Sequence, residues 1–205
     1  MQKNHLIVAI VTLILTVACA PITPQPVQES KEVTPGIKTI AFMPPEAAVA
    51  GPRLDAGVRV LSDLLTEYSR SHPDTRMVDP VLLDSSRLES GSRETLARSI
   101  GREMGSDAVL LTTLHRYLRR IGSTMSAQRP ASVAFEMKLV AVSSGRVLWF
   151  GTFDETQQPV LENLFLLQRA AARGFRFITA EELAREGVAR KLDECPFLGD
   201  DGNQE

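Results

Sequence analysis

The sequence predicts a single α/β (α+β) domain in which helices pack on a mixed β-sheet, in the order β-α-β-α-β-β-β-α-α. Three observations predict this class. Short apolar runs of strand length alternate with amphipathic helical patterns in the first half of the chain. Two alternating segments flank a Ser-Ser-Gly turn, and two helical patterns close the chain. We expect the folded domain to span residues 37–192.

The first half of the domain predicts three strands and two helices. The helix over Arg53–Ser71 carries apolar residues at steps of three and four, and His72-Pro73 ends it. Ser92 can cap a second helix that runs through Met104 and stops at Gly105. The expected strands are Ile37–Met43, Arg76–Asp79 and Asp107–Tyr117, the last in a central position.

The clearest structural signal is a β-hairpin. Residues 132–142 alternate between apolar and polar side chains. Residues 143–145 form a three-residue loop, with Gly145 where a left-handed conformation is needed. This loop length pairs Val142 with Arg146 and places the large apolar residues of both strands on one face. The further expected pairs are Leu139–Trp149, Met137–Gly151 and Phe135–Phe153.

Two helices and a tail complete the domain. Pro159 suits the first turn of a helix that extends to about Arg173. Thr179 and Glu182 form a capping-box pattern that opens a helix to about Leu192. Residues 193–205 are acidic and contain glycine, which predicts a flexible tail.

The N-terminal segment, residues 1–18, predicts a lipoprotein signal peptide. Lys3 supplies a positive charge, and Leu6–Val17 supplies about a dozen apolar residues, too few to span a bilayer as a helix. Ala18 followed by Cys19 resembles the lipobox of bacterial lipoproteins. The resemblance implies cleavage between Ala18 and Cys19 and acylation of Cys19 on its sulfur and its amine. An ordinary secretory signal and an N-terminal membrane anchor remain alternatives.

Residues 19–36 predict a lipidated cysteine followed by a proline-rich tether. In an extended conformation of about 3.1 Å per residue, the tether could reach roughly 50 Å from the membrane. Ala20 follows the cysteine, and the lack of Asp at this position resembles lipoproteins that are sorted to the outer membrane. We therefore expect a protein on the bacterial outer membrane that faces the periplasm and is held to the membrane by its N-terminal lipid.

Charge and cysteine content exclude several classes of function. Loss of Lys3 with the signal peptide leaves a mature chain with more acidic than basic residues, so no nucleic-acid partner is expected. Cys195 then has no partner within the chain. It is interpreted as a small buried apolar residue or an inert thiol of the tail, with an intermolecular disulfide as the alternative. No Cys-x-x-Cys pair predicts a zinc or thioredoxin-like site.

Histidines offer little catalytic chemistry. His72 and His115 both lack a second histidine or a carboxylate at metal-ligand spacing, so no metal and no cofactor are expected. A Ser-His-Asp triad built on His115 would need residues from elsewhere in the fold, and no Gly-x-Ser-x-Gly elbow supports it. We expect no catalytic residue and no enzyme, and a periplasmic hydrolase that uses His115 is the alternative.

One basic cluster is a candidate binding site. Arg116, Arg119, Arg120 and Arg129 lie within fourteen residues of a chain whose net charge is −2. Guanidinium groups bind phosphates and carboxylates bidentately, which predicts a site for an anionic glycan or lipid, or for an acidic protein surface. The alternative is a solvated loop whose arginines pair with Glu136, Asp154 or the acidic tail.

Three segments together resemble a family. Gly105-Ser106-Asp107-Ala108-Val109-Leu110, Pro130 to Phe135 and Ser144-Gly145-Arg146-Val147-Leu148-Trp149 resemble bacterial envelope lipoproteins related to the CsgG, LpoB and TolB amino-terminal class of periplasmic α/β domains. The resemblance covers roughly residues 37–155. It implies a domain that binds or assembles with other proteins, and it transfers no catalytic residue.

These observations lead to one expected function. The chain is expected to be a lipid-anchored periplasmic accessory or assembly protein that binds another envelope protein or forms a homo-oligomer. Pore formation is disfavoured, because residues 118–130 lack the paired stretches of about ten alternating residues that a membrane hairpin needs.

Overall fold

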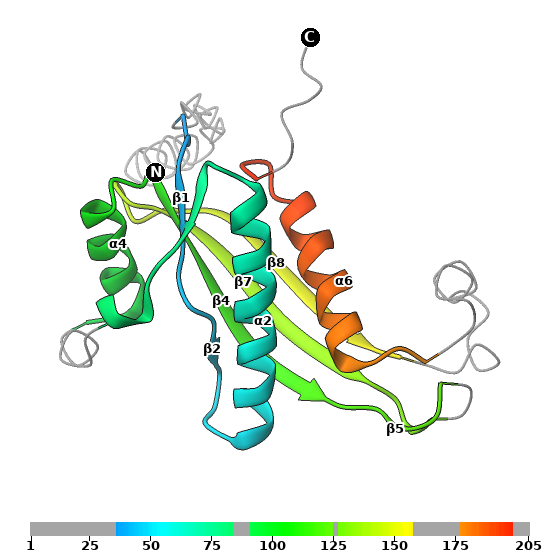
Figure 1. Cartoon of the computed structure of the whole chain (residues 1–205). Helices are drawn as coiled ribbons and strands as arrows, with labels where there is room; N and C mark the ends of the chain where they lie inside the picture. Colours follow the sequence, from blue (N-terminus) through cyan, green and yellow to red (C-terminus); the bar gives the residue numbers. More distant parts are fainter. Residues whose placement is uncertain (1–35, 84–90, 125–126, 158–176, 199–205) are drawn as a thin grey trace, which may run out of the picture. The chain divides into compact units, whose positions relative to one another are not determined.

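The computed structural model describes residues 36–83, 91–124, 127–157 and 177–198, all of which belong to one compact unit. Its main sheet is mixed and six-stranded, with the order β3-β1-β4-β7-β8 and a short strand β2 beside β4. Helices α2 and α6 lie on one face of this sheet and α4 on the other (Figure 1). The predicted fold class is confirmed. The helix expected over 159–173 lies outside the described residues.

Parallel and antiparallel pairing meet at the longest strand of the sheet. β1 (Ile40–Phe42) lies between β3 (Thr75–Met77) and β4 (Ala108–Leu118) and is parallel to both. β7 (Ser132–Ala141) and β8 (Val147–Thr156) then continue the sheet as an antiparallel meander. The sheet therefore has two described edges, one formed by the short β3 and one by the ten-residue β8.

Helix α2 (Pro52–Ser71) packs closely on β4. Its buried residues, four leucines and Gly57, recur along one face at helical spacing, as the sequence predicts. Gly57 faces the strand, and a Cβ atom there would lie 2.6 Å from Leu114 Cδ2 and 2.6 Å from Tyr117 Cγ. The absence of a side chain at this position therefore sets the distance between α2 and the sheet.

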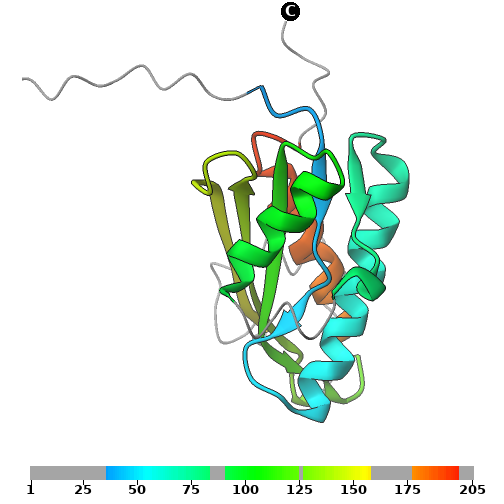
Figure 2. The same ribbon diagram turned by 90° about the vertical axis from the view of Figure 1, so that its left-hand side faces the viewer.

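The opposite face carries helix α4 (Arg93–Glu103), as the turned view shows (Figure 2). Ser92 caps this helix, as predicted, by accepting a hydrogen bond from Thr95 N–H, and Gly105 follows with a φ of 67°. The helix buries Leu96 and Ile100 in a second, smaller core. The sheet contributes Ala41, Met43, Val78, Val109, Leu111, Val140 and Val142, each of which lies in a strand or directly after one.

The β7–β8 register agrees with the prediction beyond the turn and differs beside it. Leu139 pairs with Trp149, Met137 with Gly151 and Phe135 with Phe153, and Gly145 has a φ of 75°. The expected Val142–Arg146 pair is wrong, because Ala141 N–H instead donates to Arg146 O, at 2.9 Å. A bulge between the Val140–Val147 and Leu139–Trp149 pairs shifts the register by one residue and restores the predicted pairs.

Helix α6 (Ala180–Asp193) begins with the predicted capping box, in which Thr179 and Glu182 each bond the other's backbone N–H. The chain remains in the core beyond the helix. Cys195 and Leu198 are buried, and Tyr68 Oη donates to Leu198 O at 2.7 Å. Burial also raises the pKa of the Cys195 thiol. The core thus includes residues that the sequence assigned to the tail.

Several short elements were not predicted. They are β2 (Glu46–Ala47), the 3-10 helix η1 (Pro80–Leu82), and the two strands β5 (Ile121–Gly122) and β6 (Ala127–Arg129), which form a small ribbon after β4. Within the described part of the chain, no helix combines the length and apolar character needed to cross a membrane.

Candidate functional site

The structure divides the four candidate arginines into two pairs. Arg116 Nε donates to Ser132 Oγ at 2.6 Å, and its guanidinium also forms an ion pair with Asp154. Arg120 donates to the backbone carbonyl of Phe177. These two side chains fasten the end of β4 to β7, β8 and the segment before α6. The pairing with Asp154 agrees with the alternative of arginines that pair with nearby carboxylates.

Arg119 and Arg129 have exposed side chains. Arg119 follows the last residue of β4, and Arg129 lies on β6 opposite Ile121. No hydrogen bond or ion pair joins either side chain to another residue within 36–83, 91–124, 127–157 or 177–198. These two arginines are therefore the members of the predicted cluster that a ligand could reach.

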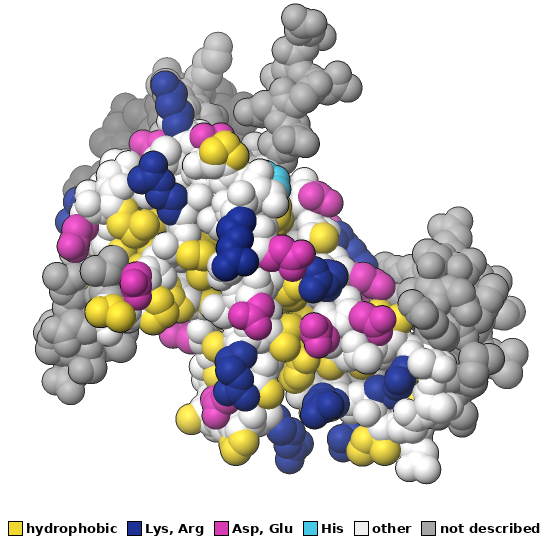
Figure 3. Space-filling view, viewed as in Figure 1, with side chains coloured by type: hydrophobic (Ala, Val, Ile, Leu, Met, Phe, Trp, Pro, Cys, Tyr) yellow, Lys and Arg dark blue, Asp and Glu magenta, His cyan; other side chains and the backbone are white. Residues whose placement is uncertain are grey.

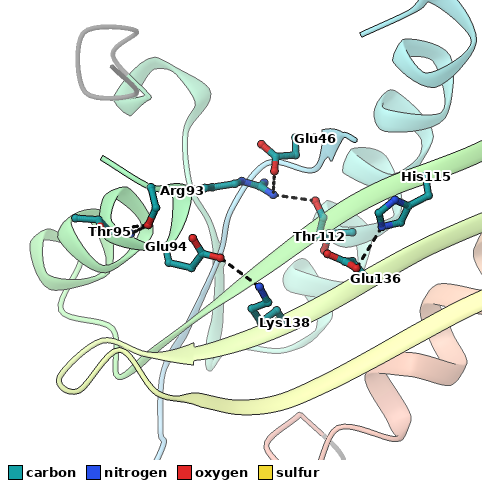
Figure 4. Close-up of polar contacts among 9 residues, drawn as sticks. Glu46, Arg93, Glu94, Thr95, Thr112, His115, Glu136 and Lys138 are labelled. Carbon is teal, nitrogen blue, oxygen red and sulfur yellow. Dashed lines mark hydrogen bonds and ion pairs between the residues drawn. The ribbon is translucent and has the colours of Figure 1, made fainter. Parts of the chain in front are cut away.

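A second polar feature occupies the part of the sheet beside α4. Six charged residues from four segments form three ion pairs there, and we call this group the charged face (Figure 4). Strand alternation places the β4 and β7 members on the face that α4 covers only in part. Its members are Glu46, Arg93, Glu94, His115, Glu136 and Lys138.

Arg93 is the most buried member of the charged face, with 16% of its side chain exposed. Its guanidinium bonds Glu46 Oε1 at 2.7 Å, Pro44 O at 2.7 Å and Thr112 O at 3.2 Å. Burial lowers the pKa of Arg93, and Glu46 opposes that effect. The side chain stays charged because guanidinium is protonated far above neutral pH. Arg93 thus ties α4 to β4 and to the segment that leads from β1 to β2.

The other two pairs link the strands to each other and to α4. Lys138 Nζ lies 3.2 Å from Glu94 Oε1. The pKa of Glu94 is lowered, first by a hydrogen bond from its own backbone N–H and then by Lys138. His115 Nε2 lies 3.2 Å from Glu136 Oε2, with both side chains partly exposed. These residues could not be predicted to form a group from the sequence, because they are far apart along the chain.

The charged face surrounds a depression of about 520 Å³. Positive and negative groups alternate around it, so it suits polar ligands that carry both charges better than it suits a simple anion. Among the described residues, His115 contacts the carboxylate of Glu136 and not a hydroxyl group that could act as a nucleophile. Among the described residues, no group of three His, Cys, Asp or Glu side chains could hold a metal ion. The lining residues are Glu46, Ala47, Ala48, Arg93, Glu94, Leu111, Thr113, Glu136 and Lys138.

The outer edge of β8 is a third candidate site. Val142 N–H donates to Asp107 O, on the β4 side of the hairpin, and Ala141 N–H donates to Arg146 O, on the β8 side. Because the backbone groups of successive strand residues point in opposite directions, even-numbered residues of β7 bond β4 and odd-numbered residues bond β8. By the same alternation, Phe150, Thr152 and Asp154 direct their N–H groups away from β7. No other strand of the described residues pairs with this edge. Phe150 and Val147 are each 51% exposed beside it.

The predicted cleavage and lipidation residues, Ala18 and Cys19, lie outside the described residues. The signal peptide and the tether therefore stay predictions.

Comparisons with known proteins concern the fold. No protein family model and no curated protein matches the chain in sequence. The structure is similar to the PelC dodecamer from Paraburkholderia phytofirmans, at 14% identity over 80% of this chain and 89% of that chain, with a TM-score of 0.51. A variant of the same PelC gives 16% identity over 80% and 90%, with a TM-score of 0.51.

The LpoB C-terminal domain from Salmonella enterica is also among the similar structures. It has 14% identity over 59% of this chain and 84% of that chain, with a TM-score of 0.38. LpoB is a member of the class that the sequence was expected to resemble.

Proposed function

We propose that this protein is a lipid-anchored accessory protein of the bacterial envelope whose α/β domain works within an assembly, with copies of itself or with another envelope protein. The observation that carries the proposal is the edge of β8. It offers a ten-residue strand whose N–H groups at Phe150, Thr152 and Asp154 point away from the sheet. An unpaired strand edge is a template for pairing with another chain.

Two further observations support assembly over catalysis. The PelC structures that share this fold at a TM-score of 0.51 are dodecamers. The ionic groups of the charged face are held against one another, and Arg93 in particular is used to join α4 to the sheet. The lipid anchor rests on the Ala18-Cys19 pattern of the signal peptide.

Native mass spectrometry of the full chain, extracted from membranes in mild detergent, tests both parts. The expected subunit mass is that of residues 19–205 plus acyl chains, and Cys19→Ser should abolish acylation. The expected complex contains more than one polypeptide. An acylated chain that stays monomeric, with no crosslinked partner in intact envelopes, would refute assembly and leave the anchor standing.

A matched pair of variants tests the edge itself. Thr152→Pro removes an outward N–H group without removing a β7–β8 hydrogen bond, whereas Thr152→Val keeps the backbone donor. We expect Thr152→Pro to lower the population of complexes at least tenfold and Thr152→Val to leave it unchanged. Equal populations for both variants would place the contact elsewhere on the domain.

A further inference from the structure

One end of the domain combines exposed arginines with exposed apolar side chains. We call it the basic end and define it as Val49, Arg53, Arg119, Ile121 and Arg129. Val49 is 66% exposed and Ile121 44% exposed, and all three arginines are exposed. Figure 3 shows Lys and Arg side chains gathered at this end, around the start of α2 and β5.

The contacts of the fold bring these residues to the same place. A depression of about 330 Å³ joins the segment from Val49 to Leu54 with the end of β4, from His115 to Leu118. Arg119 follows directly, and the ribbon pairs Ile121 with Arg129. The end of β4 therefore lies beside the start of α2 and leads directly into the ribbon.

The described carboxylates near this end do not cancel its positive charge. Asp154 is paired with Arg116, and Glu136 with His115. Among the described residues, Glu46 is paired with Arg93, and Asp55 and Glu181 are further exposed acids, at the first turns of α2 and α6. Three exposed arginines and the charge of Arg120 outnumber these two acids.

We propose that the basic end docks on the anionic surface of a phospholipid bilayer. Arginines would bind phosphate groups, while Val49 and Ile121 would enter the layer between headgroups and acyl chains. The two apolar side chains favour a bilayer over a soluble polyanion, because a polyanion offers them no apolar environment. This contact goes beyond assembly through β8, since it uses a different surface and a different partner.

The predicted tether is long enough for this contact. The chain enters the domain beside Ala108, at the start of β4, and the basic end lies just past Leu118. Eleven residues of strand span about 35 Å. A tether with a reach of roughly 50 Å could therefore let the basic end lie on the same membrane that holds the lipid.

Vesicle cosedimentation tests the proposal with residues 36–205, a unit that contains every described element and both cores. The probes are phosphatidylcholine vesicles with and without 30% phosphatidylglycerol. We expect binding only to the anionic vesicles and a steep decrease between low and high salt. The double variant Arg119→Glu/Arg129→Glu should lower the partition coefficient roughly 25-fold or more, at about fivefold per basic side chain.

Matched controls separate this surface from general charge effects. Arg70→Glu/Arg76→Glu makes the same change in charge near the other end of α2 and should have little effect, and melting curves confirm that each variant is folded. Equal losses for the two double variants, or no binding to anionic vesicles, would overturn the proposal.

Apolar variants separate a bilayer from a polyanion. Ile121→Ser should weaken vesicle binding severalfold and leave binding to soluble polyphosphate unchanged, whereas Val81→Ser, at an exposed residue of η1, should change neither. A surface that binds polyphosphate and is indifferent to Ile121→Ser would be a polyanion site, and the bilayer proposal would be wrong.

Discussion

Gly57 is the residue at which the contact between α2 and the sheet is most sensitive to side-chain size. Gly57→Ala would bring a Cβ atom to 2.6 Å from Leu114 and Tyr117, so the helix would have to move. Such overpacking costs about 1–3 kcal/mol, partly offset by the roughly 1 kcal/mol that Ala gains over Gly in a helix. Urea unfolding should therefore show a net loss of stability. Gly51→Ala, where a Cβ meets open space, should cause no such loss.

Asp107 is the residue that makes the stability of this domain depend on pH in a testable way. Its Oδ2 accepts hydrogen bonds from the backbone N–H groups of Lys38 and Thr39, both at 3.0 Å, and from Thr39 Oγ1. The bond from Lys38 is the largest cause that lowers the pKa of Asp107. A lowered pKa stabilises the fold above the unfolded value of about 3.9, and this contribution is lost as the pH falls through the folded value.

Asp107→Asn should remove that contribution. In urea unfolding between pH 3 and pH 7, the wild type should exceed the variant in stability from pH 5 upward. The difference should shrink below pH 4, because Asp107 of the wild type then becomes protonated. The other carboxylates titrate in the wild type and in the variant, so their contributions cancel in the difference between the two free energies of unfolding. A difference that stays constant down to pH 3 would contradict this role.

The capping box is the feature that matters most for helix α6. Thr179→Ala should destabilise the domain by about 0.5–2 kcal/mol, because Glu182 N–H loses its acceptor at an exposed helix start. Thr179→Ser keeps the hydroxyl and should retain most of the stability. Chemical unfolding of the three proteins measures both effects, and equal losses in Ala and Ser would point to the threonine methyl group instead.

Elements with a long periodic pattern could be predicted from the sequence, and short ones could not. The helices of 20, 11 and 14 residues and the β7–β8 hairpin have enough residues for periodicity and caps to act together. Strands β2 and β5 have two residues each, so they carry no period. The bulge near Leu139 could not be predicted either. The turn is one residue longer than expected, and the bulge adds one residue to β8, so the two changes cancel and leave the predicted pairs beyond the bulge unchanged.

The candidate sites follow the same physical limit. The arginines after β4 could be found because they are close in sequence. Their division could not, because it depends on Asp154 and on the carbonyl of Phe177, which only the fold brings near. The charged face was missed for the same reason: Glu46, Arg93 and Glu136 meet through sheet pairing and helix packing.

At the scale of the whole molecule, the C-terminal boundary of the core can be tested by truncation. A chain that ends after Leu198 should melt at the temperature of the full chain. A chain that ends after Asp193 loses buried Cys195 and Leu198 and the acceptor of Tyr68, and should be less stable by about 3 kcal/mol. Differential scanning calorimetry measures both. Equal melting temperatures would show that the last turn contributes nothing to the core.

The position of β1 also decides how the domain would respond to a mechanical pull. Tension on the chain before Gly36 enters the fold at Lys38 and Thr39, where Asp107 holds both backbone amides. Beyond them, β1 is hydrogen-bonded on both sides to parallel strands, β3 and β4. A pull along β1 therefore loads both rows of hydrogen bonds in shear and does not open them one at a time. A membrane tether joined at this point would transmit force to an inner strand of the sheet, where rupture requires the hydrogen bonds to both neighbours to break together.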